Sequence, residues 1–402
     1  MHGFKAAHGG GDEAGAAARA CVEQLARARS AEDGEKATLG LVYVTDPLAP
    51  DLPLIVDVLR AATGIGDWVG AVGTGVIGNG GGIGSGDASA AAEYHGRPGI
   101  AVLTAAGRAD DYRLFASTGE RSALDDGIAS WTRQRFPGFG IVHADPRSGS
   151  SFQMVETCAR ESGSFLVGAL SAAPTLSAAE PAGSRRARRS PSPDQVAGKP
   201  VGGGVSGVLF AGALEAATGL TQSCRPIGPA RKITSGEQNV VMALDGRAAL
   251  DCLIEDVGPE VAKDLRQVGG RVFAARPVEG SLGGDYLVRN LVAIDQQRGW
   301  IAIGDVVEEG ESIMFCSRDR PSAEADMVRM LEDLKRRAGK PPRAGVYHSC
   351  TARGPHMFGR PDAEVQMIRA ALGDFPLIGM FGNGEICQGR IYGYTGVLTL
   401  FL

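Results

Sequence analysis

The spacing of glycines is the feature that most restricts the fold of this chain. A glycine that ends a predicted helix is followed, five or six residues later, by a glycine inside a predicted strand, and this occurs three times. The three pairs are Gly64 and Gly70, Gly163 and Gly168, and Gly373 and Gly379. Each helix has apolar residues at the 3.6-residue period, and each strand is a short apolar run. The repetition predicts three copies of one β-α-β-β unit.

Each predicted unit has a strand, a helix and then further strands. In the first unit the helix is 52–63 and the strands are 39–45, 68–72 and 99–104. In the second unit the helix ends at Ser162 and the strands are 139–143, 165–170 and 205–210. In the third unit the helix is about 362–372, a strand precedes it at 344–347, and apolar runs follow at 375–386 and 394–401. The predicted fold class is α/β, with mixed β-sheets and helices on their outer faces.

Local signals mark the starts of two helices. Asp51 is expected to cap the first helix. Ser150 and Gln153 have the spacing of a capping box at the start of the second.

Different material lies between the second and third units. Three runs are expected to form antiparallel strands, at 286–295, 300–304 and 312–317, with helices at about 247–256 and 321–338. The segment 171–204 is rich in Ala, Pro, Ser, Gly and Arg and has little apolar area to bury, so we expect a disordered insert there.

The length, net charge and cysteine content of the chain restrict its expected partners and cellular compartment. A chain of 402 residues predicts two domains, and a net charge of −5 gives no reason to expect nucleic acid as a partner. The seven cysteines are odd in number and show no CxxC spacing, which favours free thiols in a reducing cytoplasm. The N-terminus lacks the apolar core of a signal peptide, and no apolar run has the roughly 20 residues of a membrane-spanning helix.

Polar residues follow the predicted strands where a ligand site is expected. Ligands of α/β folds favour the carboxyl ends of parallel strands. In the first strands those ends carry Thr45 and Asp46, His143 and Asp145, and Ser349 and Cys350. The second strands end at Thr74, Ser171 and the corner Gly382-Asn383-Gly384-Glu385.

Cys350 has two interpretations. His348, Arg353 and His356 are close in sequence and can lower the thiol pKa, which would give a reactive or ligand-binding thiol. Equally, free cysteine is often a small buried apolar residue.

A second pair of residues suits the two ends of an α-amino acid. Arg353, followed by Gly354, offers a fork for a carboxylate, and Glu385, with Asn383 in the same corner, offers an acceptor for an ammonium or amide group. The alternative is that Arg353 and Glu385 pair with each other or with the backbone. Arg289 and Arg318 are further anion contacts or, alternatively, members of salt bridges at strand ends.

Neither a cofactor nor a metal is expected. Residues 73–78 match GxGxxG after a strand, but a glycine-rich stretch follows in place of the helix that dinucleotide binding requires. The six histidines and seven cysteines show no zinc-ligand spacing.

Several blocks together resemble the FIST domain family, an intracellular sensory module with N-terminal and C-terminal parts. The most specific blocks are 349–354, 376–385 and 394–395, with support from 286–290, 306–310 and 315–319. The resemblance implies a FIST N-type domain at 1–236 and a FIST C-type domain at 237–402. It also implies sensing of small ligands, with amino acids as the proposed class, and output through a separate signalling protein.

Three function classes follow. The first is a cytoplasmic, bacterial-type sensor that binds a small molecule. The second is a thiol enzyme with Cys350 as the nucleophile, His348 or His356 as the base, and Asn383 as an oxyanion donor. The third is a protein-interaction scaffold.

Overall fold

The computed structural model describes residues 1–28, 36–80, 91–118, 123–172, 193–212, 214–278 and 284–402. These form two compact units. Unit 1 comprises 1–221, 327–391 and 395–402, and unit 2 comprises 222–326 and 392–394. The boundary expected between a FIST N-type and a FIST C-type domain, at residues 236 and 237, comes from the family resemblance and not from the compact units. It stays a prediction.

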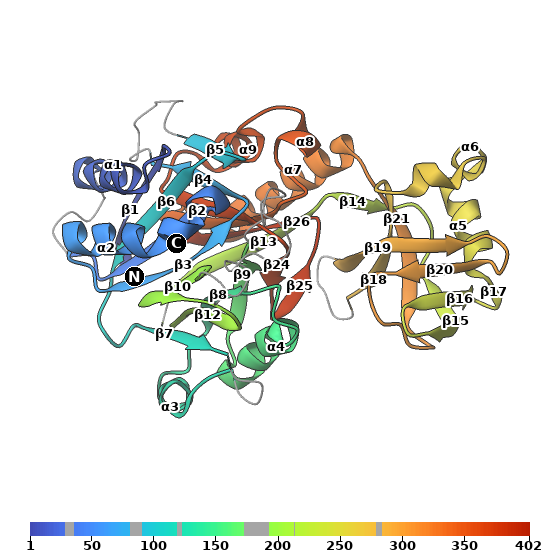
Figure 1. Cartoon of the computed structure of the whole chain (residues 1–402), viewed down its shortest axis with the longest axis horizontal. Coiled ribbons are helices and arrows are strands. Elements are labelled where there is room, and N and C mark those ends of the chain that lie inside the picture. The colour runs from blue at the N-terminus through green and yellow to red at the C-terminus, as the bar shows by residue number, and fades with distance from the viewer. Residues whose placement is uncertain (29–35, 81–90, 119–122, 173–192, 213, 279–283) are drawn as a thin grey trace, which may run out of the picture. The chain divides into compact units, whose positions relative to one another are not determined.

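Unit 1 consists of three repeats with the same order of elements, β-α-β-α-β-β-β-β (Figure 1). Repeat A contains β1 (His2–Gly10), α1 (Ala14–Arg27), β2 (Leu39–Thr45), α2 (Leu52–Thr63), β3 (Asp67–Gly73), β4 (Gly75–Asn79), β5 (Ala91–His95) and β6 (Gly99–Ala106). Repeat B contains β7 (Tyr112–Ser117), α3 (Asp126–Arg135), β8 (Phe139–Ala144), α4 (Ser151–Ser162), β9 (Phe165–Leu170), β10 (Gln195–Ala197), β11 (Lys199–Val201) and β12 (Val205–Phe210). Repeat C contains β13 (Ala216–Gln222), α7 (Arg320–Ala338), β22 (Ala344–Cys350), α9 (Ala363–Leu372), β23 (Leu377–Gly382), β24 (Glu385–Cys387), β25 (Arg390–Tyr392) and β26 (Thr395–Phe401), with the short α8 (Pro355–Phe358) after β22.

The predicted β-α-β-β plan is confirmed in all three repeats. In each, the strand before the second helix pairs in parallel with the strand after it and antiparallel with the last strand of the repeat. The parallel pairs are β2 with β3, β8 with β9 and β22 with β23. The antiparallel pairs are β2 with β6, β8 with β12 and β22 with β26.

The structure explains the glycine spacing that identified the repeats. Gly70, Gly168 and Gly379 lie opposite Val42, Val142 and Tyr347 in the three parallel pairs. A Cβ on any of these glycines would overlap the carbonyl oxygen of the residue opposite. The helix-ending glycines have positive φ angles, 71° at Gly64, 65° at Gly163 and 87° at Gly373, which glycine adopts without a steric penalty.

Each repeat gives a hairpin to the sheet of another repeat. The β4–β5 hairpin of repeat A pairs with β23, the β10–β11 hairpin of repeat B pairs with β3, and the β24–β25 hairpin of repeat C pairs with β9. The sheet orders are therefore β1-β6-β2-β3-β10-β11, β7-β12-β8-β9-β24-β25 and β13-β26-β22-β23-β4-β5. The exchange runs in a cycle, so unit 1 has approximate threefold symmetry.

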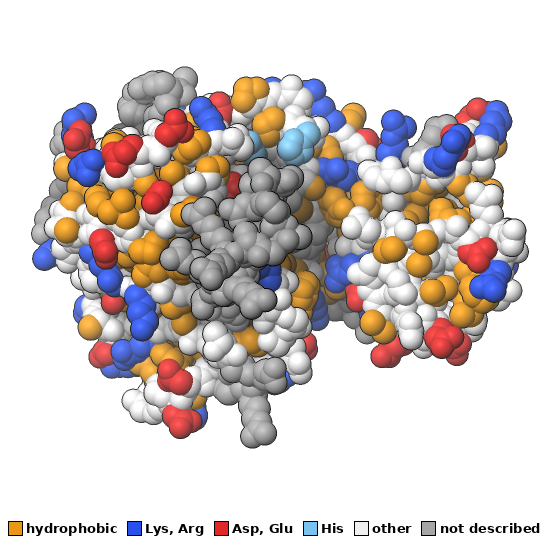
Figure 2. Space-filling model, viewed as in Figure 1, with side chains coloured by type: hydrophobic (Ala, Val, Ile, Leu, Met, Phe, Trp, Pro, Cys, Tyr) orange, Lys and Arg blue, Asp and Glu red, His pale blue; other side chains and the backbone are white. Residues whose placement is uncertain are grey.

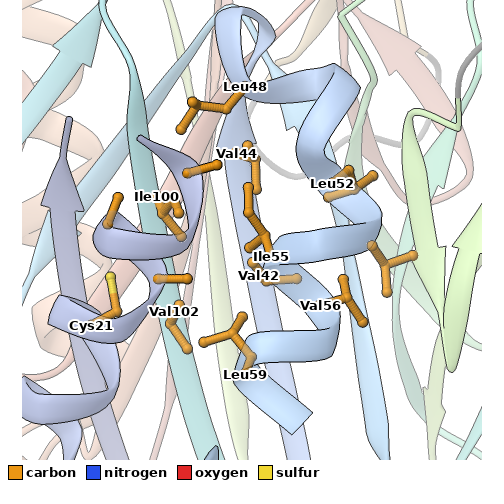
Figure 3. Packing of buried hydrophobic residues seen from close by; sticks show 14 of the residues in the cluster. Cys21, Val42, Val44, Leu48, Leu52, Ile55, Val56, Leu59, Ile100 and Val102 are labelled. Atoms are coloured by element: carbon orange, nitrogen blue, oxygen red, sulfur yellow. The ribbon is translucent and has the colours of Figure 1, made fainter. Parts of the chain in front are cut away.

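The helices cover one face of each sheet, as predicted. Figure 3 shows this for repeat A, where Val42 and Val44 on β2 face Ile55 and Leu59 on α2. Side chains alternate along a strand, so the residues between these, such as Tyr43, face the opposite way, toward the centre of unit 1. Each sheet is therefore buried on both faces.

Unit 2 is an antiparallel sheet with helices beside it. Its strands are β14 (Cys224–Pro226), β15 (Arg231–Glu237), β16 (Val240–Leu244), β17 (Arg247–Ala248), β18 (Val272–Pro277), β19 (Tyr286–Asp295), β20 (Trp300–Ile303) and β21 (Ser312–Arg318). Its helices are α5 (Ala249–Val257) and α6 (Pro259–Ala262), followed by a 3₁₀ turn at Leu265–Val268. The strands expected at 286–317 are present and antiparallel, and β21 pairs with β18, so the pairings close into a ring.

Three local expectations were wrong. The side chains of Asp51 and Ser150 make no capping hydrogen bond, and the Ser150 hydroxyl instead contacts Ser148 and Met154. Most of the insert expected at 171–204 lies outside the described residues. Its C-terminal part, however, forms β10 and β11, because Val196 is buried and Gly198 makes a tight turn with φ of 69°.

Among the described residues, no helix is both long enough and apolar enough to cross a membrane.

Candidate functional site

The two corners expected to form the site lie at the same edge of one sheet. Cys350 is opposite Gly382 in the parallel β22–β23 pair, and Thr351 N–H donates to the Gly382 carbonyl at 2.8 Å. The turn 350–354 and the corner 382–385 therefore follow neighbouring strands at their carboxyl ends.

The corresponding corners of the other repeats join this edge. Thr74 N–H, after β3, donates to Phe381 O at 2.9 Å, and the Thr74 hydroxyl donates to Thr351 Oγ1 at 2.9 Å. Leu170 N–H, at the end of β9, donates to Gly384 O at 2.8 Å. The exposed Asn383 donates from Nδ2 to Ser171 O at 3.2 Å. Residues from all three repeats thus surround the carboxyl ends of the parallel strands.

Arg353 pairs with Glu364, on the first turn of α9, and not with Glu385. The Arg353 Nε–Glu364 Oε1 distance is 2.8 Å, and both side chains are fully buried. Glu364 also accepts hydrogen bonds from the hydroxyls of Tyr347, at 2.6 Å, and Ser349, at 3.1 Å. Burial alone would lower the pKa of Arg353, but the negative charge of Glu364 raises it, so Arg353 stays charged.

Comparison of the repeats shows that this polar cluster is peculiar to repeat C. Nine residues before the helix-ending glycine, repeats A and B have Ile55 and Met154 where repeat C has Glu364. The strand positions of Tyr347 and Ser349 are occupied by Val42 and Val44 in repeat A and by Val142 and Ala144 in repeat B. All six of these residues belong to apolar cores. Well-packed apolar residues often stabilise a protein as much as a buried ion pair does, so stability gives no reason for the cluster.

The hairpin received from repeat A completes the cluster. Glu93 on β5 accepts the N–H groups of Glu364 and Val365 at 2.9 and 3.0 Å, and so caps α9. Its second oxygen lies 3.2 Å from His95 Nε2. The His95 ring packs against Phe381 and occupies the space that a side chain at Gly354 would need. Burial raises the pKa of Glu93.

Glu385 is a fully buried carboxyl group with only one satisfied oxygen. Its Oε2 accepts from Thr395 Oγ1 at 2.6 Å and from Thr395 N–H at 3.2 Å, whereas no described residue donates to Oε1. Burial raises the pKa of Glu385 to about 8. The equivalent residues, by strand register, are Val76 in repeat A and Gln195 in repeat B.

A second polar centre, which the sequence patterns did not reveal, lies on the inner faces of the sheets. Tyr43, His143 and His348 occupy the same position in the three repeats and are fully buried. The Tyr43 hydroxyl is 2.8 Å from His348 Nε2 and 3.1 Å from His143 Nε2. Burial lowers the pKa of His143 to about 3, and burial and then His143 lower the pKa of His348 well below its usual value. A sequence signal for this centre did exist. Tyr43, His143 and His348 each come directly after the residue that lies opposite a strand glycine, so they are at equivalent positions of the three repeats.

The remaining predicted residues have the following places. Cys350 is 6% exposed, and all seven cysteines are buried thiols that form no disulfide. His348 is hydrogen-bonded to the Tyr43 hydroxyl. The Nε2 atom of the exposed His356 lies 3.2 Å from the Thr351 carbonyl oxygen. In unit 2, Arg289 forms an ion pair with Asp305 at 2.8 Å, and Arg318 lies over the Tyr394 ring.

Two cavities open at the opposite, amino ends of the parallel strands. One, of about 600 Å³, includes Thr38, Asp67 and Tyr112 in its lining, and another, of about 500 Å³, includes Phe139, Phe165 and Phe210. Neither is lined by a predicted site residue.

The surface and the metal-ligating residues add two observations. The described residues contain no group of three or more His, Cys, Asp or Glu side chains placed to hold a metal ion. On the face shown in Figure 2, basic and acidic side chains are interspersed over the described surface.

Two family models together match most of the chain, and curated relatives match half of it. Models of the FIST N domain and the FIST C domain match residues 38–247 and 249–388. An uncharacterized protein of Mycobacterium tuberculosis is 34% identical over 210 residues, which cover 50% of this chain and 54% of the relative. An uncharacterized protein of Mycobacterium bovis is 31% identical over 210 residues, which cover 50% and 53%. The chain thus spans about half the length of the curated relatives it matches. FIST domains are in general sensory domains that bind small ligands in signalling, and this chain belongs to the FIST family.

Proposed function

We propose that this protein is a sensor that binds a small molecule, of the amino-acid class, at the carboxyl ends of β22 and β23. The observation that carries the proposal is the buried polar cluster of repeat C, because the chain itself has apolar residues at the equivalent positions of repeats A and B. A charged cluster that stability does not require is typical of a functional site.

The proposed site has an exposed edge and a buried interior. Cys350 and Gly354 belong to one corner and Asn383 and Gly384 to the other, and Asn383 is exposed. Glu385 and Arg353, from the same corners, are fully buried. In this arrangement Arg353 acts through Glu364, which it holds in place. Arg289 belongs to unit 2, so the proposed site is built from residues of unit 1.

A thermal-shift screen of amino acids and related metabolites tests the proposal. A ligand at about 100 times its dissociation constant should stabilise the protein by roughly 2.7 kcal/mol. Native mass spectrometry of the purified protein should show the same ligand as a bound mass. A flat response across the panel, with no bound mass, would contradict the proposal.

Two variants locate the binding. Asn383→Ala should weaken binding of any hit at least several-fold. Arg390→Ala, an exposed change on β25, should leave binding unchanged. Equal binding by both variants and the parent would place the ligand elsewhere.

We further propose that the bound state is read by a separate signalling protein. A pull-down with and without the identified ligand tests this step. A partner retained equally in both conditions would favour a scaffold role.

A further inference from the structure

The polar cluster of repeat C contains three buried carboxyl groups and one buried guanidinium. Arg353 and Glu364 are fully buried and form an ion pair. Glu93, which is 3% exposed, caps the same helix and contacts His95. Glu385 is the third carboxyl group, and the opposing charges of Arg353 and Glu364 both act on it. The guanidinium of Arg353 is thus already ion-paired with Glu364.

Glu385 differs from Glu364 and Glu93 in how many of its carboxyl oxygens are hydrogen-bonded. Glu364 accepts bonds at both oxygens, from Arg353, Tyr347 and Ser349. Glu93 also uses both oxygens, toward the N–H groups of α9 and toward His95. At Glu385, both bonds end on Oε2, and no described residue donates to Oε1. A buried ionised oxygen without a donor is costly.

Repeat B shows what a neutral side chain does in this position. Gln195 accepts from Ser206 Oγ at 2.6 Å and donates toward Gly204 O at 3.5 Å, so both ends of its amide have partners. The neutral amide of Gln195 is thus hydrogen-bonded at both its oxygen and its nitrogen. The carboxyl group of Glu385, at the equivalent position, has one oxygen to which no described residue donates a hydrogen bond.

We propose that Glu385 holds a proton on its unpaired oxygen in the free protein and exchanges it for a positively charged group of the ligand. This rests on the proposed function and narrows it to ligands with an ammonium or similar cationic group. The proton balance is simple: the carboxylic acid loses one proton to solvent, and the resulting carboxylate pairs with the bound cation. The raised pKa of Glu385 agrees with a protonated acid near neutral pH.

Among the described residues, Arg353 is the cation whose charge acts on Glu385. Arg353, after β22, is held by Glu364 on α9. β26 contributes the Thr395 hydroxyl and N–H, and β9 places Ala169 opposite Glu385.

The test uses matched probes in which the cationic group is present or absent. Each amino acid that stabilises the protein is compared with its methyl ester, which keeps only the ammonium, and with the corresponding 2-hydroxy acid, which keeps only the carboxylate. We expect the ester to bind and the hydroxy acid to bind at least tenfold more weakly.

Proton release is measured by titration calorimetry in buffers of different ionisation enthalpy. About one proton should leave per ligand bound. The association constant should rise about tenfold per pH unit below the pKa of Glu385, as one linked proton requires. Glu385→Gln should abolish both effects. Glu215→Gln, which removes an exposed acid paired with Lys340, is the matched control and should preserve both.

The outcomes distinguish this inference from the proposed function. Binding of a hydroxy acid as tight as that of the amino acid, or binding without proton release, would overturn the inference and leave the sensor role intact. Failure of every probe to bind would overturn both. In the free protein, an infrared band of protonated carboxyl groups should be present at pH 6 and weaker in Glu385→Gln; equal bands in the parent and the variant would also overturn the inference.

Discussion

At the scale of single residues, Tyr43 links two histidines that come from the other two repeats. Its hydroxyl has one proton, so it donates to one imidazole and accepts from the other. The two histidines must therefore be in different tautomers. The three repeats share a backbone plan, but each contributes a chemically different group to this centre: a phenol, and two imidazoles in different tautomers.

Replacing Tyr43 by phenylalanine should destabilise the protein. Both Nε2 atoms would lose their partner while remaining buried, and an unsatisfied buried polar group costs about 1–3 kcal/mol. Urea unfolding at pH 7.5 measures the change. A loss below about 0.5 kcal/mol would show that the hydroxyl adds no stability there.

The residues of the candidate site were only partly predictable. The corners with Cys350, Arg353, Asn383 and Glu385 could be located, because turn residues after apolar strands have a local sequence signal. The partner of Arg353 could not, since Glu364 occupies a helix position that faces inward and its role depends on packing against β22. The cap from Glu93 was equally hidden, because it comes from 271 residues away in the chain.

At the scale of elements, one glycine per repeat permits the parallel strand pair. At this glycine the two paired strands lie so close that a Cβ would overlap a carbonyl oxygen of the neighbouring strand, as at Gly70, Gly168 and Gly379. Their spacing from the helix-ending glycine varies by only one residue, because the helix and the loop after it must return the chain to the same end of the first strand.

Alanine at Gly70, Gly168 or Gly379 should prevent folding or cost more than about 3 kcal/mol, since a Cβ would overlap a backbone carbonyl that cannot move without breaking the pair. Gly66→Ala and Gly138→Ala are the controls, because an added Cβ has open space at both positions. Soluble yield and urea unfolding provide the comparison. Similar stability in all five variants would mean that the strands can separate to admit a Cβ.

The elements themselves were largely predictable from sequence. The helix expected at 52–63 has those bounds, and the strand expected at 286–295 does too. Short hairpins were harder: β10 and β11 have three residues each, and a composition-based argument assigned them to the insert. Their strand character depends on pairing with β3, in a different repeat.

At the scale of the whole molecule, two sets of buried groups make stability depend on pH in opposite directions. The folded protein lowers the pKa of His143 and His348 and raises that of Glu385. Below about pH 6.5 the unfolded chain binds more protons at the histidines, so stability falls as pH falls. Between about pH 4.5 and about pH 8 the folded protein binds more protons at Glu385, so that contribution falls as pH rises.

Variants should separate these two effects. His143→Gln with His348→Gln should reduce the acid loss, and Glu385→Gln should remove the fall toward pH 8, each by up to about 1.4 kcal/mol per pH unit and per group. Unfolding free energies at pH 5, 6, 7 and 8 measure the slopes. Parallel curves for the parent and the variants would show that these groups do not titrate differently on folding.

The sequence by itself determined the repeated plan, because helical periodicity, chain-reversing glycines and short apolar runs are properties of neighbouring residues. It also located the two corners at the strand ends and the likeness to the FIST family. Only the tertiary structure decided which repeat exchanges a hairpin with which, that Arg353 belongs to Glu364, and that three equivalent positions meet at one buried centre. Those contacts join segments separated by up to about 300 residues, as Tyr43 and His348 are. Such pairings depend on the free energy of the whole packed molecule and have no local pattern.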